Sequence, residues 1–330
     1  MMLRNPIINI GGVDVLNIGD PHLGKKFSSA FPDRRNDIAE KNWQMFEFFI
    51  VHETTSIKVV CGDIFDKPKV DEADLLRAAN ILRSSKHKII VLEGNHDSSK
   101  TSLEKTSFDV LVELLKGCEH IRFIRGVETI SIGTELVTFI GWEYHNSIQE
   151  QIEKYMPSNV EYVYTHVDFE SFGSDKSNCI PFSLLEKYGV KYVINGHEHL
   201  PKRTTVGSID YIGTGSMLPH DRSQQHDSDK ETYADFFINV YADDVDTAVS
   251  FTDKFVYYHS NDFSDIPEFK DAYGVILKKV NADQETDTSV LIEFDEISIP
   301  VLLHKSAEIT GLAESEVNKL IQEFVEVENE

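Results

Sequence analysis

The sequence predicts an α/β fold for roughly its first 240 residues, and three observations support this prediction. Short runs rich in Val and Ile alternate with longer segments whose apolar residues recur at helical spacing. Several short runs end at a glycine, where the chain can turn sharply. With 330 residues, the chain also exceeds the ~250–300 residues of a usual single core, so a smaller second part is expected. Alternating strands and helices of this kind form layered α/β proteins.

Local patterns place the individual elements. The helix at 35–54 carries apolar Ile38, Trp43 and Phe46 at helical spacing, and the helix at 71–83 has acidic residues in its first turn. Further helices are expected at 103–115, 147–156 and 181–188. Strands are expected at 13–18, 57–60, 88–92, 136–140, 160–164, 190–194 and 209–212.

The pattern changes after about residue 241, where polar linkers separate β-rich runs and a small α+β appendage is expected. Its strands are expected at 251–257, 272–280 and 289–294. Two short helices should follow, with Gly311 ending the first and Leu320 and Phe324 on an apolar stripe of the second. These helices are expected at 299–309 and 314–327. The predicted domains are 1–242, 243–297 and 298–330.

Charge is distributed unevenly along the chain. There are 56 acidic and 32 basic residues, for a net charge of −24, and residues 221–330 alone hold 26 acidic and 8 basic residues. Phosphate binding needs Lys and Arg, so a chain this acidic is not expected to bind nucleic acid by charge alone. If DNA is the substrate, bound metal or a basic partner must supply positive potential. The other interpretation of the acidic third is a solvated, self-repelling surface.

A cytoplasmic location is expected from three features. Cys61, Cys118 and Cys179 are scattered without disulfide or zinc spacing, which suits a reducing compartment. The first residues are broken by Asn5 and Pro6, so they make a poor signal peptide. No run approaches the ~18 apolar residues of a transmembrane helix, so no membrane partner is expected.

Five of the predicted strands run directly into a cluster of Asp, Asn or His. In an α/β sheet, ligands bind at the carboxyl ends of the strands, so the five clusters should converge on one crevice. The candidate metal ligands in them are Asp20, His22, Asp63, Asn95, His166, His197 and His199.

The chemistry of these side chains indicates a metal site. Asp20-x-His22 and His197-x-His199 each place two ligands on the same side of an extended segment. Seven ligands exceed the need of one tetrahedral ion and suit two divalent ions ~3.5–4 Å apart, with Asp63 bridging them. A mixture of oxygen and nitrogen ligands without a thiolate favours manganese, with iron, zinc or magnesium also possible.

Each cluster taken singly has an ordinary structural explanation. Gly94-Asn95 is typical of a turn, and a lone His166 would be read as a satisfied core histidine. The coincidence of five clusters in order, holding five of the thirteen histidines, favours the metal site. His220 and His226 follow a strand end on the same face and stay open, whereas the remaining histidines are read as ordinary.

The clusters resemble the five motifs of the calcineurin-like metallophosphoesterases in order and spacing, over about residues 13–215. The matching segments are Asp20-x-His22, Gly62-Asp63-x-x-Asp66, Gly94-Asn95-His96-Asp97, His166 and Gly196-His197-x-His199. The resemblance implies a four-layer αββα sandwich with a small α+β capping domain and a C-terminal helical hairpin. It also implies that Asp20, His22, Asp63 and His199 hold one ion, and that Asp63, Asn95, His166 and His197 hold the other.

His96 is the candidate catalytic residue. It lies between the ligand Asn95 and Asp97, so it projects toward the site without having to bind metal. It would act as general acid for the leaving oxygen or as a transition-state donor, with Asp97 or Asp66 orienting its ring. The alternative is a purely structural role for His96.

A narrower resemblance is to the SbcD-type repair nucleases and to the small nuclease subunit of T-even phage recombination endonucleases. Residues 19–24, 62–66, 141–142 and 211–217 carry it. Asp66 departs from eukaryotic and archaeal relatives, which often have His there, and this favours the bacterial or phage branch. The resemblance implies a DNA exonuclease and endonuclease that acts in recombination or repair. It also implies that the protein forms a homodimer within a heterotetramer that contains an SMC-like coiled-coil ATPase. The hairpin at 298–330 would bind that ATPase.

Two other functions remain open: a stand-alone metallophosphoesterase acting on nucleotides or small phosphodiesters, and a metal-stabilised scaffold. A small-substrate enzyme needs neither the appendage nor the hairpin, and a scaffold does not need His96. Basic residues after the first, third and fifth motifs would guide a DNA backbone, or they are ordinary solvated loop residues. They are Lys25, Lys26, Arg34, Arg35, Lys100, Lys105, Lys202 and Arg203.

Overall fold

The structure is a computed structural model in which the chain divides into two compact units. The described residues are 4–27, 35–101, 104–169, 177–220, 222–231, 233–244, 251–252, 254–262, 267–269, 272 and 274–279. All of them belong to the first unit, which comprises Met1–Ser171 and Asp175–Val280. The expected strand at 289–294 and the expected helices at 299–309 and 314–327 lie outside the described residues.

The first sheet has the strand order β1-β2-β3-β4-β5. Its strands β2 to β5 are parallel, whereas β1 forms an antiparallel hairpin with β2. The strands are β1 (Ile7–Ile10), β2 (Val13–Ile18), β3 (Ile57–Val60), β4 (Lys88–Leu92) and β5 (Ile121–Ile124). Helices join the parallel strands: α1 (Arg35–Glu47), continued by the π-helical segment Phe48–His52, α2 (Glu72–Ser84) and α3 (Ser107–Leu114).

The second sheet has the strand order β10-β11-β9-β8-β7-β6, with parallel pairing from β11 to β7 and an antiparallel strand at each edge. Its strands are β6 (Val127–Ile132), β7 (Glu135–Ile140), β8 (Tyr162–Thr165), β9 (Tyr192–Asn195), β10 (Lys202–Val206) and β11 (Ile209–Gly213). Its helices are α4 (Ile148–Tyr155) and α5 (Phe182–Lys187).

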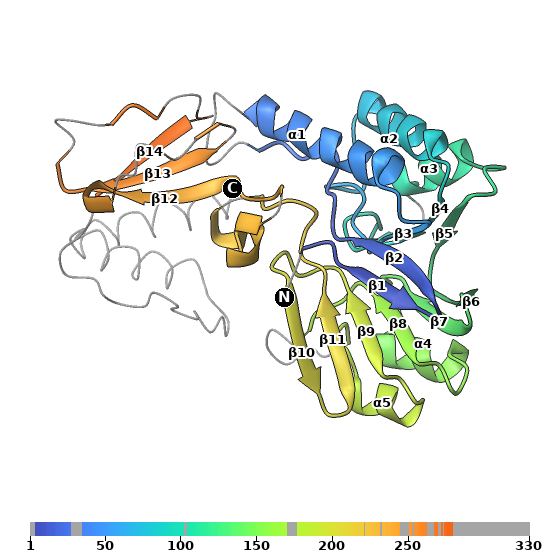
Figure 1. Ribbon diagram of the computed structural model, residues 1–330. Helices are drawn as coiled ribbons and strands as arrows, with labels where there is room; N and C mark the ends of the chain where they lie inside the picture. Colours follow the sequence, from blue (N-terminus) through green and yellow to red (C-terminus); the bar gives the residue numbers. More distant parts are fainter. Residues whose placement is uncertain are drawn as a thin grey trace, which may run out of the picture. The chain divides into compact units, whose positions relative to one another are not determined.

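The two sheets pack face to face between outer layers of helices, with α1 to α3 beside the first sheet and α4 and α5 beside the second (Figure 1). Val59 of the first sheet and Phe139 of the second lie in one buried cluster between the sheets. There Tyr164 stacks on Phe139, with ring centroids 4.7 Å apart, and its hydroxyl donates to Asn17 Oδ1 at 2.6 Å. The fold is therefore a mixed α/β fold of two mixed sheets in αββα layers, as the sequence predicts.

A third, parallel sheet has the order β12-β13-β14. Its strands are β12 (Phe237–Tyr241), β13 (Phe255–Ser260) and β14 (Gly274–Lys279). Short 3₁₀ turns at Arg222–Gln224 and Asp227–Glu231 precede it, and another at Ala242–Asp244 follows β12. Because β12 pairs with β13, this sheet begins before the boundary that was expected at residue 242.

Several element bounds differ from those expected. Strands β1, β5, β6, β10 and β12 were not expected from the sequence. Helix α3 begins at Ser107 rather than at 103, because Thr106 caps it: the Thr106 side chain accepts the Asp109 N–H, and the Asp109 carboxylate accepts the Thr106 N–H.

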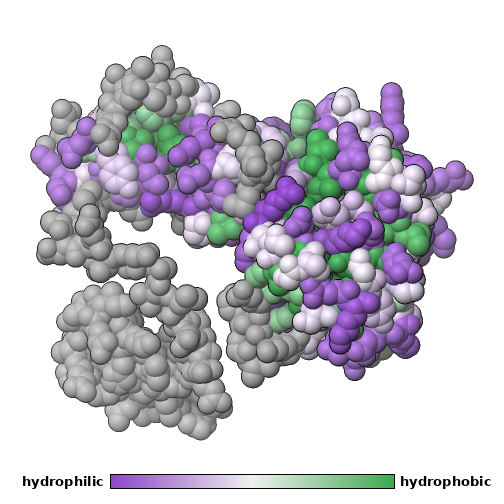
Figure 2. Space-filling view, turned by 60° about the horizontal axis from the view of Figure 1, so that its bottom comes forward, coloured by the Kyte–Doolittle hydropathy of each residue, from purple (hydrophilic) through white to green (hydrophobic). Residues whose placement is uncertain are grey.

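The surface of the described residues mixes hydrophilic side chains with smaller apolar patches (Figure 2). In the described part of the chain, none of the helices is both long and apolar enough to cross a membrane.

Candidate metal centre

The predicted ligands lie on loops at the carboxyl ends of strands from both sheets. Asp20 and His22 follow β2, and Asp63 and Asn95 follow β3 and β4. His166, His197 and His199 follow β8 and β9 of the second sheet. The backbone N–H of His22 donates to the Asp63 carbonyl at 2.9 Å, and that of Leu23 donates to the Ile64 carbonyl at 2.8 Å. Adjacent loops are thus hydrogen-bonded to one another where the ligands meet.

Four of the predicted ligands have a backbone conformation that is unfavourable for side-chain-bearing residues. The φ angles are +26° at Asp20, +43° at His22, +48° at Asp63 and +71° at His197. Such conformations cost of the order of 1–3 kcal/mol each and persist where the surrounding structure enforces them, typically at functional sites. The surrounding structure therefore holds these residues in strained backbone conformations that direct their side chains toward the site.

Two glycines allow the loops to approach each other closely. A Cβ atom at Gly62 would lie 2.0 Å from His166 Nδ1, and one at Gly94 would lie 2.2 Å from Asp63 Oδ1. Real Cβ atoms do not approach so closely, so any larger residue at either position would displace a predicted ligand. This explains why glycine precedes the ligand in both motifs.

One group of ligands surrounds Asp63 on the side of the second sheet. Asp63 Oδ2 lies 3.2 Å from His166 Nε2, and Asn95 Oδ1 lies 3.0 Å from the same nitrogen and 3.1 Å from His197 Nδ1. Ligand atoms of Asp63, His166 and His197 all lie within 4.8 Å of one another. Two ligands of one divalent ion, each ~2.1 Å from it, are ~3–4 Å apart, so this spacing suits a shared ion.

A second group lies on the other side of Asp63. His22 Nε2 is 3.6 Å from Asp63 Oδ2 and 3.1 Å from His199 Nε2, which is itself 3.9 Å from Asp20 Oδ2. Asp63 is therefore within reach of both groups. The bridging role that the sequence suggests for this carboxylate stays a prediction.

The hydrogen bonding of Asp20 shows that the site fits a cation. The carboxylate is fully buried, and neither of its oxygens has a hydrogen-bond partner among the described residues. Burial raises the pKa of Asp20, although His166 opposes that effect. The nearest charged partner of Asp20 is His166, whose Nδ1 lies 3.6 Å from Asp20 Oδ1. That distance is longer than a hydrogen bond, so a divalent ion would compensate the buried charge more fully.

The same proximity perturbs the histidines. Burial alone would lower the pKa of His166, but Asp63 and Asp20 outweigh burial and raise the pKa to about 10. Burial would raise the pKa of Asp63, yet His166 and His22 lower it. By contrast, burial and the neighbouring His22 lower the pKa of His199 to about 3. His199 is therefore a neutral imidazole, the form that binds metals, whereas His166 carries a proton that a metal must displace.

His96 lies at the edge of these groups. Its backbone N–H donates to Asp63 Oδ1 at 2.8 Å, its ring Nδ1 lies 2.6 Å from the Asp66 carbonyl oxygen, and its ring meets that of His22 edge-on at 4.8 Å. The main-chain carbonyl of Asp66 thus orients the ring. The Asp66 carboxylate instead pairs with Lys25 at 3.0 Å and lies 3.5 Å from His22 Nδ1.

Asp97 lies next to His96 in sequence but has another set of contacts. Its buried carboxylate accepts N–H groups from Ile64, Phe65 and Gly94 at 3.0–3.2 Å. These bonds join the Asp63 loop to the Asn95 loop. In this structure, Asp97 therefore positions the backbone of two loops, and the expectation that it orients the His96 ring finds no contact among the described residues.

Three further side chains contact the predicted ligands. Asp168 Oδ1 lies 2.9 Å from His197 Nε2, and the Trp142 ring stacks on His197 with centroids 5.8 Å apart. His220, which the sequence left open, packs against His22 and His199. Asp168 had no motif signal, and only its placement after β8 links it to the site, whereas Trp142 lies in a segment that carries the nuclease resemblance.

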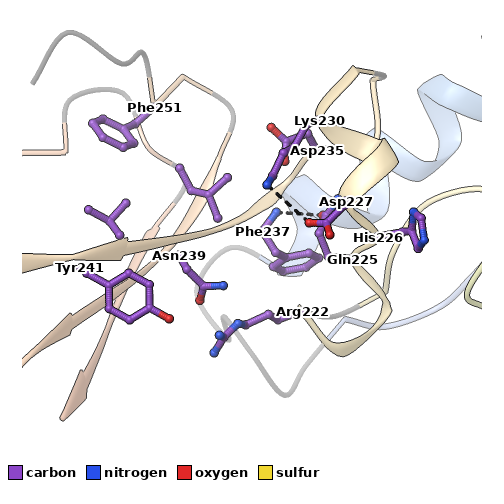
Figure 3. Close-up of a pocket in the computed structure, with 12 residues that line it drawn as sticks. Arg222, Gln225, His226, Asp227, Lys230, Asp235, Phe237, Asn239, Tyr241 and Phe251 are labelled. Carbon is purple, nitrogen blue, oxygen red and sulfur yellow. Dashed lines mark hydrogen bonds and ion pairs between the residues drawn. The ribbon is translucent and has the colours of Figure 1, made fainter. Parts of the chain in front are cut away.

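A cavity of about 680 Å³ lies elsewhere, between the turns at 222–231 and strand β12 (Figure 3). Its walls include Arg222, His226, Asn239 and Tyr241, and none of the predicted ligands is among the described residues that line it. His226 therefore belongs to this cavity, and its ring Nδ1 lies 2.7 Å from Ser228 Oγ.

Comparison with known protein families agrees with the fold. The chain belongs to the calcineurin-like phosphoesterase family, whose model matches residues 13–201. The protein is accordingly a metal-dependent phosphoesterase with His and Asp groups that can bind divalent metal. No curated protein sequence matches it.

Solved structures with similarity include three hydrolases. The phosphopantetheinyl hydrolase from Mycobacterium tuberculosis is 14% identical, with a TM-score of 0.36, over 62% of this chain and 89% of that one. An archaeal phosphodiesterase is 16% identical, with a TM-score of 0.30, over 61% and 83%. A putative 5'-nucleotidase from Staphylococcus aureus is 14% identical, with a TM-score of 0.37, over 62% and 48%.

Proposed function

We propose that the protein is a two-metal phosphodiesterase that cleaves DNA, with manganese as its preferred ion. The observation that carries the proposal is the placement of His96 beside Asp63, which both ligand groups share. Asp20, His22, Asp63 and His199 would hold one ion, and Asp63, Asn95, His166 and His197 the other. When bound, the ions would neutralise the negative charge of a phosphodiester and lower the pKa of an attacking water.

The contacts of His96 suit a role as a proton donor. The Asp66 carbonyl accepts the ring Nδ1–H, so the ring is fixed and its Nε2 is the nitrogen left to face substrate. A protonated ring then donates Nε2–H to the leaving oxygen of the scissile bond. His96 needs no metal bond for this role, which distinguishes it from its neighbour Asn95.

DNA as the substrate is supported by the nuclease-type segment at 19–24 and by exposed lysines that follow two of the ligand motifs in the sequence. Lys26, Lys100 and Lys105 are exposed on the loops that follow the first and third motifs. Lys25 is already paired with Asp66, and Lys202 lies over the Phe169 ring, 3.4 Å from its centroid. The exposed lysines would guide a phosphate backbone toward the site in an otherwise acidic protein.

A second candidate is hydrolysis of nucleotides or other small phosphodiesters. The net charge of −24 favours it, because a small substrate needs no extended basic surface. We also propose, from the sequence resemblance, that residues 298–330 bind an SMC-like coiled-coil ATPase, and that a homodimer of this chain forms the heterotetramer with it.

The test compares linear duplex DNA with bis-p-nitrophenyl phosphate, with manganese added and with excess chelator. We expect manganese-dependent cleavage of both, abolished by chelation while the circular dichroism spectrum of the protein stays the same. Cleavage of the small diester alone would select the second candidate. Cleavage of either substrate at full rate in excess chelator would refute the two-metal site.

A further inference from the structure

His220 is a buried histidine whose ring has no hydrogen-bond partner. It lies after β11, its side chain is only 7% exposed, and neither Nδ1 nor Nε2 is bonded to any described group. Leaving a buried polar atom unsatisfied costs about 1–3 kcal/mol, and such atoms in native proteins usually indicate a missing partner. The unpaired imidazole therefore indicates a bound partner that the described residues do not supply.

The surroundings of His220 identify that ligand. The ring lies 4.8 Å from the His199 ring and 5.1 Å from the His22 ring, both edge-on, and Phe27 closes another side at 5.7 Å. One nitrogen from each of the three histidines lies within 4.8 Å of the other two. The carboxylate of Asp20, also without hydrogen-bond partners, is within 3.9 Å of His199 Nε2. Three imidazole nitrogens, with a buried carboxylate beside one of them, suit a cation.

We propose that His220 is an additional ligand of the ion held by Asp20, His22 and His199. This inference rests on the proposed two-metal function and adds a nitrogen to one of its two ions. Side-chain shifts of less than about 1 Å bring the three imidazoles to the ~3–4 Å separation of ligands on one ion.

The additional imidazole makes the two ion positions chemically different. The position with His22, His199 and His220 is rich in nitrogen, and imidazole ligands suit zinc, iron, cobalt and nickel. Magnesium demands oxygen ligands and retains water, so it is disfavoured there. The other ion position, with Asn95, His166 and His197, has only two imidazoles. It is therefore expected to discriminate less between these ions.

The test measures metal binding by the full-length protein after chelation, with zinc and cobalt as the probes. Wild type, His220→Ala and His220→Phe are compared by titration calorimetry and by the visible spectrum of bound cobalt. We expect both variants to lose at least tenfold in affinity for one of two ions, since even residues that only support metal ligands contribute 10–100-fold. Their cobalt spectra should also change, while the affinity for magnesium stays the same.

His226→Ala is the matched control, because His226 lies on the same stretch of chain but lines the separate cavity. It should bind both ions with wild-type affinity. His220→Phe retains an aromatic ring in the buried position, so it reports on ligation should the alanine variant unfold.

Wild-type affinities and an unchanged cobalt spectrum in a folded His220 variant would overturn the proposal. So would a variant that keeps its metal affinities but loses inhibition by inorganic phosphate, because His220 would then contact substrate. If the wild-type protein binds neither zinc nor cobalt and also does not bind manganese, the two-metal function itself fails, and titration of the wild-type protein alone reveals it.

Discussion

His96 contacts the shared carboxylate through its backbone and the Asp66 carbonyl through its ring, so its two contacts can be separated by substitution. His96→Ala should leave the Asp63 contact intact and remove the ring. We expect metal binding to persist and DNA turnover to fall about 10²–10⁴-fold, the usual contribution of a positioned acid. Nitrophenolate leaves without protonation, so the loss on bis-p-nitrophenyl phosphate should be smaller. His52→Ala, at an exposed histidine, is the control. Wild-type rates on both substrates would contradict the acid role.

The proton on His166 predicts how metal affinity depends on pH. Because Asp63 and Asp20 outweigh burial and raise the pKa of His166 to about 10, the ring is protonated at pH 7 and must lose that proton to bind metal. Manganese affinity should therefore rise about tenfold per pH unit from pH 6.5 to 8.5 through this group, levelling off above pH 10. Calorimetry in buffers of different ionisation enthalpy should detect about one released proton. His166→Gln should lose this proton, and an unchanged pH slope in that variant would refute the assignment.

The seven candidate metal ligands could be predicted from the sequence because each follows a recognisable β-rich run, and ligands bind at the carboxyl ends of strands. His220 could not be assigned in this way, since residues 214–219 separate it from the end of β11. Only folding of that loop over His22 and His199 reveals its position. The contacts of Asp97 could not be predicted from the sequence either, because a side chain that accepts hydrogen bonds from three backbone amides has no sequence signature.

Among the elements, the π-helical segment Phe48–His52 is hydrogen-bonded to Lys58, a buried lysine of β3. Lys58 Nζ donates to the carbonyls of Phe49, Ile50 and Glu53 at 2.6–3.1 Å. Lys58→Met would remove these donors and leave buried acceptors unpaired, so we expect a loss of about 3 kcal/mol in unfolding free energy. The denaturant midpoint measures it, and Lys88→Met, an exposed lysine on the neighbouring β4, should change little. Equal midpoints for the two variants would show that the lysine is not needed there.

The elements that the sequence failed to predict share a physical cause. Asn5 and Pro6 indicated a broken chain, yet residues 7–10 form an edge strand that pairs with β2. Strand β10 carries alternating Lys, Arg and Thr side chains that suit a half-exposed edge and give little apolar signal. The central strands β3 and β4 were predicted with their observed bounds because burial on both faces favours mostly apolar runs, with Lys58 the buried exception in β3.

At the scale of the whole molecule, deletion of residues 298–330 tests the proposed ATPase contact. All predicted ligands precede this segment, so the truncated chain should bind metal and keep basal manganese-dependent cleavage. It should lose binding to a coiled-coil ATPase from the same genome, measured by co-purification and by ATP-linked stimulation of cleavage. Leu320→Asp and Phe324→Asp should have the same effect, because helix docking relies on apolar anchors. If ATPase binding survives the deletion, the contact lies elsewhere; unfolding would assign the segment to the core.

The location of every predicted ligand at the carboxyl ends of the strands determines where the chain can be lengthened. One residue inserted within β2, β3, β4, β8 or β9 would turn the following ligand toward the opposite face of its sheet. The loops that enter these strands carry no ligand, and residues 157–159 before β8 are exposed. A peptide tag or a fluorescent label introduced at Ser158 therefore reports on the protein without disturbing the crevice, and natural length variation should accumulate at that end too.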